Sequence, residues 1–275
     1  MIKACVIGWP IKHSRSPLIH GFWLRKHGLE GSYTKRAVEP HELGDFLQHL
    51  DRQGLSGCNV TVPHKEAAFK LAQVVDEAAS AVEAANTLWL ENGELHASNT
   101  DIYGFMTHLN QSAAGWNDRQ RPVALLGAGG AARAILFGLK QAGVKEVRLF
   151  NRTSARAHEL AACYDAGVSV VDWQRRDEGL EDCGLVINAT TLGMEGCPAL
   201  DLSLYRLPGD AVVADIVYVP LETDLLAAAR QKGCRTVDGL GMLLHQAVPG
   251  FERWFGIRPQ VTAELRELIV ADLGE

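Results

Sequence analysis

Residues 123–134 run Val123-Ala124-Leu125-Leu126-Gly127-Ala128-Gly129-Gly130-Ala131-Ala132-Arg133-Ala134, an apolar stretch followed by closely spaced glycines and alanines. The apolar stretch predicts a buried strand, and the alanine-rich sequence after the glycines predicts a helix. Gly127 allows a tight turn between them, Gly129 lets the backbone approach a pyrophosphate, and Ala132 lets helix and strand pack closely. The helix N-terminus offers free N–H groups and a favourable dipole to phosphates. The pattern predicts a dinucleotide site, with a glycine turn that binds no ligand as the alternative.

The residues after the next strand indicate which dinucleotide is bound. A site for NAD places an aspartate or glutamate there, on the ribose hydroxyls. Here residues 147–150 are followed by Asn151-Arg152-Thr153, with Arg156 one turn further on. No carboxylate is present to repel a 2′-phosphate, and two guanidinium groups can pair with it. The sequence therefore favours NADP over NAD, although a pair of exposed arginines at a helix start is also a common surface pattern.

Both halves of the chain alternate strand-like and helix-like stretches. Further apolar strands are predicted at 168–171, 185–188 and 212–216, separated by helical stretches, which is typical of a parallel, doubly wound sheet. In the first third, the predicted strands are 4–7, 33–38 and 58–62, and the predicted helices are 18–27, 40–50 and 63–71. Residues 87–91 and 94–97 flank Asn92-Gly93, the dipeptide that best suits a type I′ hairpin turn.

The length of 275 residues favours two domains. We expect an α/β substrate domain from residues 1–100 and 238–275, and a dinucleotide-binding Rossmann domain from residues 101–237. A helix over 101–110 and a polar linker over 111–120 lead into the second domain. Helices predicted over 239–255 and 261–273 are expected to pack back on the first domain.

Composition excludes several classes of function. The net charge of -6 and pI near 5.9, without a cluster of lysine and arginine, argue against nucleic acid or an anionic membrane as the main partner. The 6 cysteines are scattered and have no zinc-like spacing, so no metal site is predicted and a reducing compartment fits. Residues 1–10 contain no signal-peptide core, and no apolar run could span a membrane. A cytoplasmic protein is expected.

Three segments of the first domain combine polar residues with glycine and proline at predicted strand ends, where open α/β sheets bind ligands. In residues 8–20, Ser14 and Ser16 can offer hydroxyls to a small carboxylate, although Ser16 could instead cap a helix. In residues 59–65, a strand delivers Thr61 and Lys65 to one place, although a lone lysine is usually solvated. Residues 98–104, with Asn86-Thr87 before them, add amides and Asp101, which by itself would most often be a helix cap.

Together these motifs resemble the shikimate dehydrogenase family over nearly the whole chain. The motifs occur in order: Gly-x-Pro-x-x-His-Ser-x-Ser-Pro-x-x-His from Gly8, Asn-Val-Thr-Val-Pro-His-Lys from Asn59, Asn-Thr-Asp-x-x-Gly from Asn99, Gly-Ala-Gly-Gly-Ala-x-x-Ala from Gly127 and Asn-Arg-Thr from Asn151. The resemblance implies a substrate domain and an NADP-binding Rossmann domain. It also implies reduction of 3-dehydroshikimate to shikimate, a step towards chorismate and the aromatic amino acids. A monomer or a homodimer is expected.

The resemblance also implies roles for individual residues. Those implied for the substrate carboxylate are Ser14, Ser16 and Tyr218, and those for its hydroxyls are Thr61, Asn86, Asp101 and Gln246. Lys65 and Asp101 form the implied catalytic pair. Those implied for the cofactor are Gly127, Ala128, Gly129, Gly130 and Ala131 at the pyrophosphate, Asn151, Arg152, Thr153 and Arg156 at the adenosine phosphate, and Thr190, Val217, Gly239 and Met242 at the nicotinamide. One departure is Glu83, which stands where the family commonly has glycine, so the backbone beside Asn86 is expected to differ.

Ketone reduction needs a hydride on carbon and a proton on oxygen, so the site requires NADPH and a general acid. Lys65 is the expected proton-transferring group and Asp101 its orienting partner, with an exchange of these roles as the alternative. Three rival functions remain: a quinate or quinate/shikimate dehydrogenase, which could use NAD; a methylenetetrahydrofolate dehydrogenase; and a paralogue that binds shikimate and NADP without turnover. The serine loop disfavours the second, and the Lys65/Asp101 pair disfavours the third.

Overall fold

The computed structural model describes residues 1–117, 121–164 and 166–274. The chain divides into two compact units. Unit 1 comprises Met1–Gly104 and the segment from Leu244 onward, and unit 2 comprises Phe105–Leu243. Both boundaries fall inside helices, α5 (Asp101–Ser112) and α9 (Gly239–Phe255), each of which therefore contributes residues to both units. Part of the predicted polar linker, residues 118–120, lies outside the described residues.

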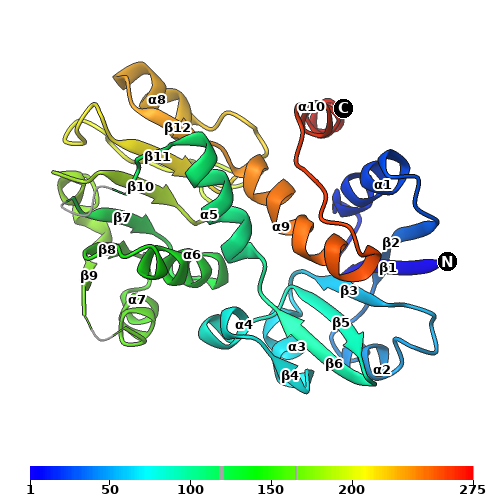
Figure 1. Cartoon of the computed structure of the whole chain (residues 1–275). Helices are drawn as coiled ribbons and strands as arrows, with labels where there is room; N and C mark the ends of the chain where they lie inside the picture. The colour runs from blue at the N-terminus through cyan, green and yellow to red at the C-terminus, as the bar shows by residue number, and fades with distance from the viewer. Residues whose placement is uncertain (118–120, 165, 275) are drawn as a thin grey trace. The chain divides into compact units, whose positions relative to one another are not determined.

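Unit 1 is built on a mixed sheet with the strand order β2-β1-β3-β5-β6-β4 (Figure 1). The strands are β1 (Ile2–Gly8), β2 (Gly31–Ala37), β3 (Gly57–Val60), β4 (Val74–Val75), β5 (Thr87–Glu91) and β6 (Glu94–Ser98). β1 pairs in parallel with β2 and β3, whereas β5 runs antiparallel to β3 and β6. The hairpin predicted at Asn92-Gly93 is confirmed: both residues have positive φ, 53° and 84°, as a type I′ turn requires.

Helices cover both faces of this sheet. On one face, α2 (Leu43–Gln48), α3 (Lys65–Leu71) and α4 (Glu77–Val82) contribute apolar side chains to a core that includes Ile7 and Leu88. The prediction missed β4 and α4. β4 is only 2 residues long, and α4 has only 6, so neither offers enough sequence for a periodic pattern.

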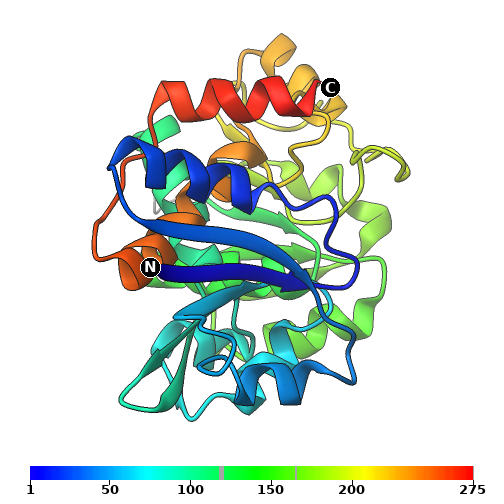
Figure 2. The same cartoon turned by 90° about the vertical axis from the view of Figure 1, so that its right-hand side faces the viewer.

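The opposite face is covered by α1 (Ser16–Lys26) and α9, and α10 (Ala263–Leu273) lies on α1. The indole of Trp254 donates to the backbone oxygen of Leu88 (3.0 Å), which fastens α9 to the sheet. The indole of Trp23 donates to the backbone oxygen of Gln260 (3.1 Å), which fastens the segment before α10 to α1. Figure 2 shows α10 alongside α1, and the Lys26–Glu264 ion pair joins these two helices. The terminal helices therefore pack on the first unit, as predicted.

Unit 2 is a parallel sheet with the strand order β12-β11-β10-β7-β8-β9. The strands are β7 (Val123–Leu126), β8 (Val147–Phe150), β9 (Val168–Val171), β10 (Leu185–Asn188), β11 (Val212–Asp215) and β12 (Arg235–Val237), and the other helices are α6 (Gly130–Gln141), α7 (Ser154–Ala161) and α8 (Asp224–Lys232). The chain crosses from β7 to β8 on one side and to β10 on the other, which is the doubly wound topology of the Rossmann fold.

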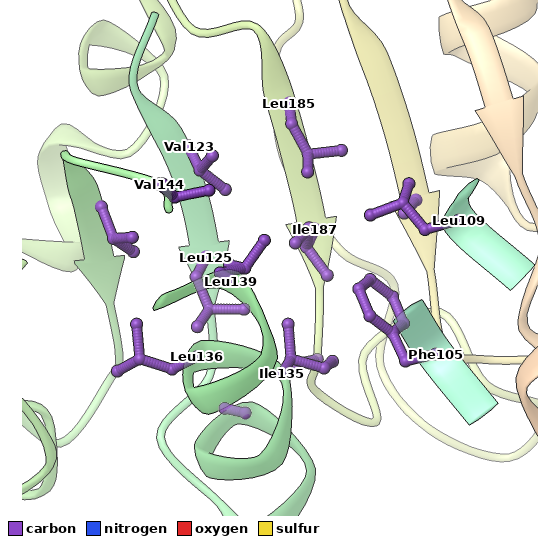
Figure 3. Close-up of a cluster of buried hydrophobic side chains, with 14 of the residues drawn as sticks. Phe105, Leu109, Val123, Leu125, Ile135, Leu136, Leu139, Val144, Leu185 and Ile187 are labelled. Carbon is purple, nitrogen blue, oxygen red and sulfur yellow. The ribbon is translucent and has the colours of Figure 1, made fainter. Parts of the chain in front are cut away.

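Alternate residues of these strands point to two separate cores. Leu125 and Ile187 meet Ile135 of α6 and Phe105 of α5 on one face (Figure 3). On the other face, Leu126 and its neighbours pack against α8 and the loops before it. Because both faces are buried, β7 is a continuous apolar run and β10 is one up to Asn188, and both were predicted with the bounds observed. β8 and β9 each contain one polar residue, Arg148 and Ser169, and their bounds were predicted correctly as well.

Two expectations about unit 2 were wrong. The connection from β9 to β10 contains only 3-10 turns (Trp173–Arg175 and Glu178–Leu180), and the connection from β10 to β11 contains no helix. Leu204 and Leu207 instead fill the second core from a loop, so apolar spacing there did not mean a helix. β12 was also missed, because it is a three-residue edge strand with one buried side chain. Within the described residues, no helix has the length and apolar character needed to cross a membrane.

Candidate active site

Lys65 and Asp101 form the centre of the site in unit 1. Lys65 is the first residue of α3 and Asp101 the first residue of α5. The ammonium of Lys65 lies 2.5 Å from Oδ2 of Asp101, and the two side chains are 31% and 13% exposed. The pair is therefore sheltered by protein and still open to a small ligand. The structure brings together two residues that are 36 positions apart in the sequence.

Asn86 determines how Asp101 is held. The backbone N–H of Thr100, which can only donate, points at Oδ1 of Asn86 (2.8 Å). The amide oxygen is therefore on the Thr100 side, and the amide nitrogen donates to Oδ1 of Asp101 (2.9 Å). Asp101 thus accepts from Asn86 on one oxygen and from Lys65 on the other. This arrangement suits a carboxylate that orients Lys65.

Gln246 joins this group from α9. Its backbone oxygen accepts from the hydroxyl of Thr100 (2.8 Å), and its side-chain oxygen accepts weakly from Asn86 (3.4 Å). Gln246 is 9% exposed and Asn86 is 3% exposed. Four residues predicted for the site, Lys65, Asn86, Asp101 and Gln246, are therefore neighbours within one unit.

Polar residues for which no role was predicted support Asn86 through hydrogen bonds. Asn59 lies in β3 and donates to the hydroxyl of Thr87 (3.1 Å), which in turn donates to Oδ1 of Asn86 (3.1 Å). Tyr33 donates to Asn59 from the other side (2.5 Å). A signal was present, because Asn59 is a polar residue inside a strand that is buried at every position. Its partners depend on sheet register, which the sequence does not show.

The serine loop lies between β1 and α1. The hydroxyl of Ser14 donates to the hydroxyl of Ser16 (3.3 Å). Ser16 is not the helix cap: Arg15 occupies that position, without a side-chain cap. The loop is held from two sides, by an ion pair between Arg15 and Asp272 (2.9 Å) and by donation from Lys35 to the backbone oxygen of Lys12 (2.6 Å). Paired hydroxyls beside several cationic groups suit an anionic ligand.

Thr61 follows β3 directly and is partly buried. Its backbone N–H donates to the backbone oxygen of Ile7 (2.9 Å), and its methyl group lies against Gly8, where a Cβ would meet it at 2.6 Å. The loops that follow β1 and β3 are thereby fixed to each other at the carboxyl edge of the sheet.

The glycine turn of unit 2 has the geometry of a phosphate site. Gly127 has φ +112°, and a Cβ there would lie 2.8 Å from the backbone oxygen of Ala189. Gly129 is the N-cap of α6, and space is open around both Gly129 and Gly130. Ala128 and Ala131 are partly exposed beside them. A pyrophosphate can therefore approach the free N–H groups of the helix.

The end of β8 fits a phosphate group on the adenosine ribose. Asn151 donates to the backbone oxygen of Thr153 (2.8 Å), and Thr153 is the N-cap residue of α7. Arg152 and Arg156 are exposed, and neither guanidinium group has an ion-pair or hydrogen-bond partner in the described part of the chain. Two unpaired guanidinium groups at a helix start match a phosphate dianion.

The residues expected at the nicotinamide come from three segments of unit 2. Thr190 follows β10, Val217 follows β11, and Gly239 begins α9; Tyr218, which was expected at the substrate carboxylate, comes next to Val217. A Cβ at Gly239 would lie 2.6 Å from the backbone oxygen of Val217, so only glycine lets these segments meet. Tyr218 and Met242 are partly buried, and Met242 also packs on the first core of unit 2. No group of three or more potential metal ligands is found among the described residues.

A glycine turn at the head of a parallel doubly wound sheet, together with an α/β unit that presents a lysine–carboxylate pair, defines a two-domain dinucleotide-dependent oxidoreductase. Three family models match along the chain: the shikimate dehydrogenase substrate binding domain at residues 6–88, shikimate/quinate 5-dehydrogenase at 109–193, and the shikimate 5′-dehydrogenase C-terminal domain at 239–265. The chain belongs to the shikimate dehydrogenase family, as the sequence motifs indicated.

Individual relatives agree over almost the full length. A protein of Mesorhizobium japonicum named shikimate dehydrogenase (NADP(+)) is 56% identical, with 98% of this chain and 96% of the relative covered. The shikimate 5-dehydrogenase of Thermus thermophilus, solved with NADP(H) and shikimate, has a TM-score of 0.88 at 34% identity and covers 99% of this chain and 100% of its own. A quinate dehydrogenase of Corynebacterium glutamicum, solved with NAD, has a TM-score of 0.90 at 30% identity and covers 98% and 99%.

Proposed function

We propose that this chain catalyses the reversible reduction of 3-dehydroshikimate to shikimate with NADPH as cofactor. The reaction is a step of the shikimate pathway, which leads to chorismate and the aromatic amino acids. The Lys65–Asp101 pair carries the proposal, because a sheltered ammonium beside a carboxylate is what ketone reduction requires of the protein. Relatives more than half identical over nearly the whole chain bear the same activity in their names.

Lys65 donates the proton to the ketone oxygen. When bound, NADPH would supply the hydride that the carbonyl carbon requires to become an alcohol. After it donates its proton, Lys65 is left as a neutral amine, which solvent reprotonates. Asp101 accepts from Lys65 and Asn86 and holds the ammonium in place. In the reverse direction, the neutral amine of Lys65 takes the hydroxyl proton. Because the donor arrangement around Asn86 leaves Asp101 as an acceptor on both oxygens, we assign proton transfer to Lys65.

The substrate is recognised by its carboxylate and its hydroxyl groups. We assign the carboxylate to Ser14, Ser16 and Tyr218, and the hydroxyls to Thr61, Asn86, Asp101 and Gln246. The interaction between the two serine hydroxyls and the cationic groups around Lys12 support the first assignment. The hydrogen bonds that join Asn86, Asp101 and Gln246 support the second.

We assign substrate binding to residues 1–100 and 238–275, and cofactor binding to residues 101–237. Gly127 to Ala131 bind the pyrophosphate, because the turn leaves the N-terminus of α6 open. Asn151, Arg152, Thr153 and Arg156 bind the adenosine 2′-phosphate. Thr190, Val217, Gly239 and Met242 line the nicotinamide end. We further propose that the protein works in the cytoplasm as a monomer or homodimer; its six cysteines are all free thiols, which fits a reducing compartment.

Initial rates with shikimate or quinate, each with NADP or NAD, test the function. We expect the highest kcat/KM with shikimate and NADP. Quinate with NAD is the second candidate, because a quinate dehydrogenase solved with NAD shares this fold closely. Arg152→Ala serves as an internal check, since it should weaken NADP use and leave NAD use nearly unchanged. Faster turnover of quinate, or a preference for NAD, would overturn the substrate or cofactor assignment, and no turnover in any combination would overturn the proposed reaction.

A further inference from the structure

Asp215 is a buried carboxylate to which no catalytic or binding role has been given. It is the last residue of β11, it is 2% exposed, and every hydrogen-bond partner it has is neutral. A carboxylate removed from water without a cationic partner is unfavourable for stability, so its presence calls for a functional reason. We propose that Asp215 is a positioning residue that fixes the two loops at the nicotinamide end of the cofactor site.

The first loop is reached through Asn188. In the parallel ladder of β10 and β11, Asn188 pairs with Asp215, so their side chains lie next to each other at the carboxyl edge of the sheet. The amide nitrogen of Asn188 donates to Oδ1 of Asp215 (2.9 Å). This leaves the amide oxygen of Asn188 to accept from the backbone N–H (3.1 Å) and the hydroxyl (2.7 Å) of Thr190. Asp215 therefore determines the orientation of the amide that holds Thr190.

The same loop also touches the glycine turn. A Cβ at Gly127 would lie 2.8 Å from the backbone oxygen of Ala189 and 3.2 Å from the methyl group of Thr190. The loop after β10 thus lies directly against the turn assigned to the pyrophosphate. A shift of Asn188 would move this loop relative to Gly127.

The second loop is bound by Asp215 itself, without an intermediate residue. The backbone N–H of Val217 donates to Oδ1 of Asp215 (3.0 Å), and the hydroxyl of Thr223 donates to Oδ2 (2.8 Å). Thr223 is also the N-cap of α8, where its oxygen accepts from the backbone N–H of Leu226. The loop from Val217 to Thr223 is therefore fastened to Asp215 at both ends. It carries Tyr218, and its first residue lies against Gly239.

The chemistry of the partners explains why this position holds aspartate. Three donors converge on the two oxygens: an amide N–H, a backbone N–H and a hydroxyl. Only an ionised carboxylate accepts on both atoms, whereas asparagine would point its own donor at one of these groups. Burial raises the pKa of Asp215 to about 6, and hydrogen bonds from Val217, Thr223 and Asn188 oppose that rise. The ionised, loop-fixing form is thus the main one at neutral pH.

The inference rests on the proposed use of NADP, and its test compares two ligands. NADPH reaches the nicotinamide end, whereas 2′,5′-ADP contains only the adenosine and its phosphates. In Asp215→Asn, we expect the dissociation constant of NADPH to rise by roughly 10- to 100-fold, the usual effect of losing a hydrogen bond to a buried charge. The dissociation constant of 2′,5′-ADP should change by less than about two-fold, since its assigned contacts lie at β7 and β8. Turnover with NADPH should fall as well.

Matched variants separate positioning from loss of fold. Thr223→Val removes one donor to Asp215 and the cap of α8, and Thr223→Ser restores the hydroxyl. We expect Thr223→Val to change the NADPH to 2′,5′-ADP ratio in the same direction as Asp215→Asn, and Thr223→Ser to return it to the wild-type value. Asp201→Asn changes a side chain of the same unit that is 99% exposed, and it should leave the dissociation constants of both ligands unchanged. If Asp215→Asn does not fold, the comparison of Thr223→Val with Thr223→Ser tests the positioning role instead.

A pH series gives an independent readout. The 2′-phosphate is common to both ligands, but the 5′-phosphate of 2′,5′-ADP is a monoester that also titrates near pH 6, whereas the pyrophosphate of NADPH does not. The wild type is therefore compared with Asp215→Asn at each pH, so that the titration of the ligands cancels between the two proteins. The preference of the wild type for NADPH over 2′,5′-ADP, divided by the same preference in Asp215→Asn, should fall as pH drops through about 6, because only the wild type has a carboxylate to protonate at this position. Equal losses for both ligands, or no change in either, would overturn the positioning role. A wild type that binds NADPH but does not oxidise shikimate would overturn the proposed reaction and leave the binding comparison valid.

Discussion

Lys65 is the single side chain on which the proposed chemistry depends most. Its ammonium lies 2.5 Å from Oδ2 of Asp101, and the proposed proton transfer is assigned to it. Lys65→Ala should lower kcat by about 100- to 10,000-fold, the usual contribution of a positioned acid or base, and change KM for shikimate much less. Lys70→Ala is the matched control, because Lys70 is exposed on the same helix. Near-normal turnover in Lys65→Ala would remove this residue from the mechanism.

His20 is a fully buried histidine enclosed by aromatic rings. It stacks on Tyr33 with ring centroids 3.9 Å apart, and Trp23, Phe251 and Trp254 surround it. Neither ring nitrogen has a well-oriented hydrogen-bond partner. Burial lowers the pKa of His20 to about 3, and a weaker interaction with Asn59 acts in the opposite direction. His20 therefore stays neutral in the folded protein at every pH where the enzyme is expected to work.

The pKa of His20 predicts acid sensitivity of folding. The unfolded chain binds a proton at this residue below about 6.5, whereas the folded chain does so only near 3. The free energy of unfolding should therefore fall as pH drops through this window, by about 3 kcal/mol from this group between pH 7 and pH 4.5. Urea unfolding at pH 7 and at pH 4.5 measures this change in the free energy of unfolding. His20→Phe should remove that part of the pH dependence, and His41→Phe, at an exposed site, should retain it. If the free energy of unfolding depends on pH equally in His20→Phe and in the wild type, His20 is not the source of this pH dependence.

At the scale of elements, α4 ends in a strained conformation. Its C-cap residue, Glu83, has φ 50° and ψ 34°, in the left-handed region that favours glycine. The resemblance to the family led us to expect glycine here, and this chain carries a side chain where the backbone prefers none. Glu83 is exposed and its neighbour Asn86 keeps its hydrogen bonds to Thr100 and Asp101. The substitution thus affects the helix end and leaves the orientation of the amide intact.

Glu83→Gly should raise the free energy of unfolding by roughly 0.5–1 kcal/mol, because relief of the left-handed strain exceeds the entropy that glycine gains in the unfolded chain. Ser80→Gly, an exposed site inside the same helix, should lower it by about 0.5–1 kcal/mol. Chemical denaturation of both variants and the wild type shows whether the free energy of unfolding rises in Glu83→Gly and falls in Ser80→Gly. A loss of stability in Glu83→Gly would mean that the Glu83 side chain makes a favourable contact that outweighs the strain.

The elements also show which parts of the fold can be predicted from sequence. β7 was predicted with its observed bounds, because a strand buried on both faces is a continuous apolar run next to a recognisable turn. β8, whose apolar residues are interrupted only by Arg148, was predicted with its observed bounds as well. The loop around Leu204 and Leu207 was expected to contain a helix, since buried leucines in a loop give the same apolar spacing. β12 and β4 were missed, because edge strands of two or three residues gain their stability from the neighbouring strand rather than from their own pattern.

In the candidate site, too, some features could be predicted from the sequence and others could not. Lys65 and Asp101 stand in motifs, so the sequence pointed to both. The orientation of Asn86 follows from a backbone N–H contributed by Thr100, and the link between Asn188 and Asp215 follows from the register of β10 against β11. Such relations are set by which residues pair across a sheet. A single sequence names the residues but not their partners.

At the scale of the whole molecule, each unit has its own hydrophobic core, and the first unit is completed by the C-terminal segment. Ile269 and Leu265 of α10 are both 0% exposed, whereas Val270, the next residue on the same helix, is 36% exposed. Among the described residues, the buried members of the two cores of unit 2 lie between Phe105 and Val237, and Met242, which packs on the first of them, also belongs to unit 2. Stability lost at α10 should therefore be confined to the unit that α10 completes.

Ile269→Ala should lower the free energy of unfolding of unit 1 by about 2–5 kcal/mol, since it leaves a cavity under α10, and Val270→Ala should cost less than about 1 kcal/mol. Hydrogen exchange resolved by segment is the measurement. In Ile269→Ala, amide protection should fall in β1, β2 and α1 and persist in β7, β8 and β10, and 2′,5′-ADP should still bind. An equal loss of protection across both sheets would show instead that the two units unfold as one cooperative body, in which case the C-terminal helix stabilises unit 2 as much as unit 1.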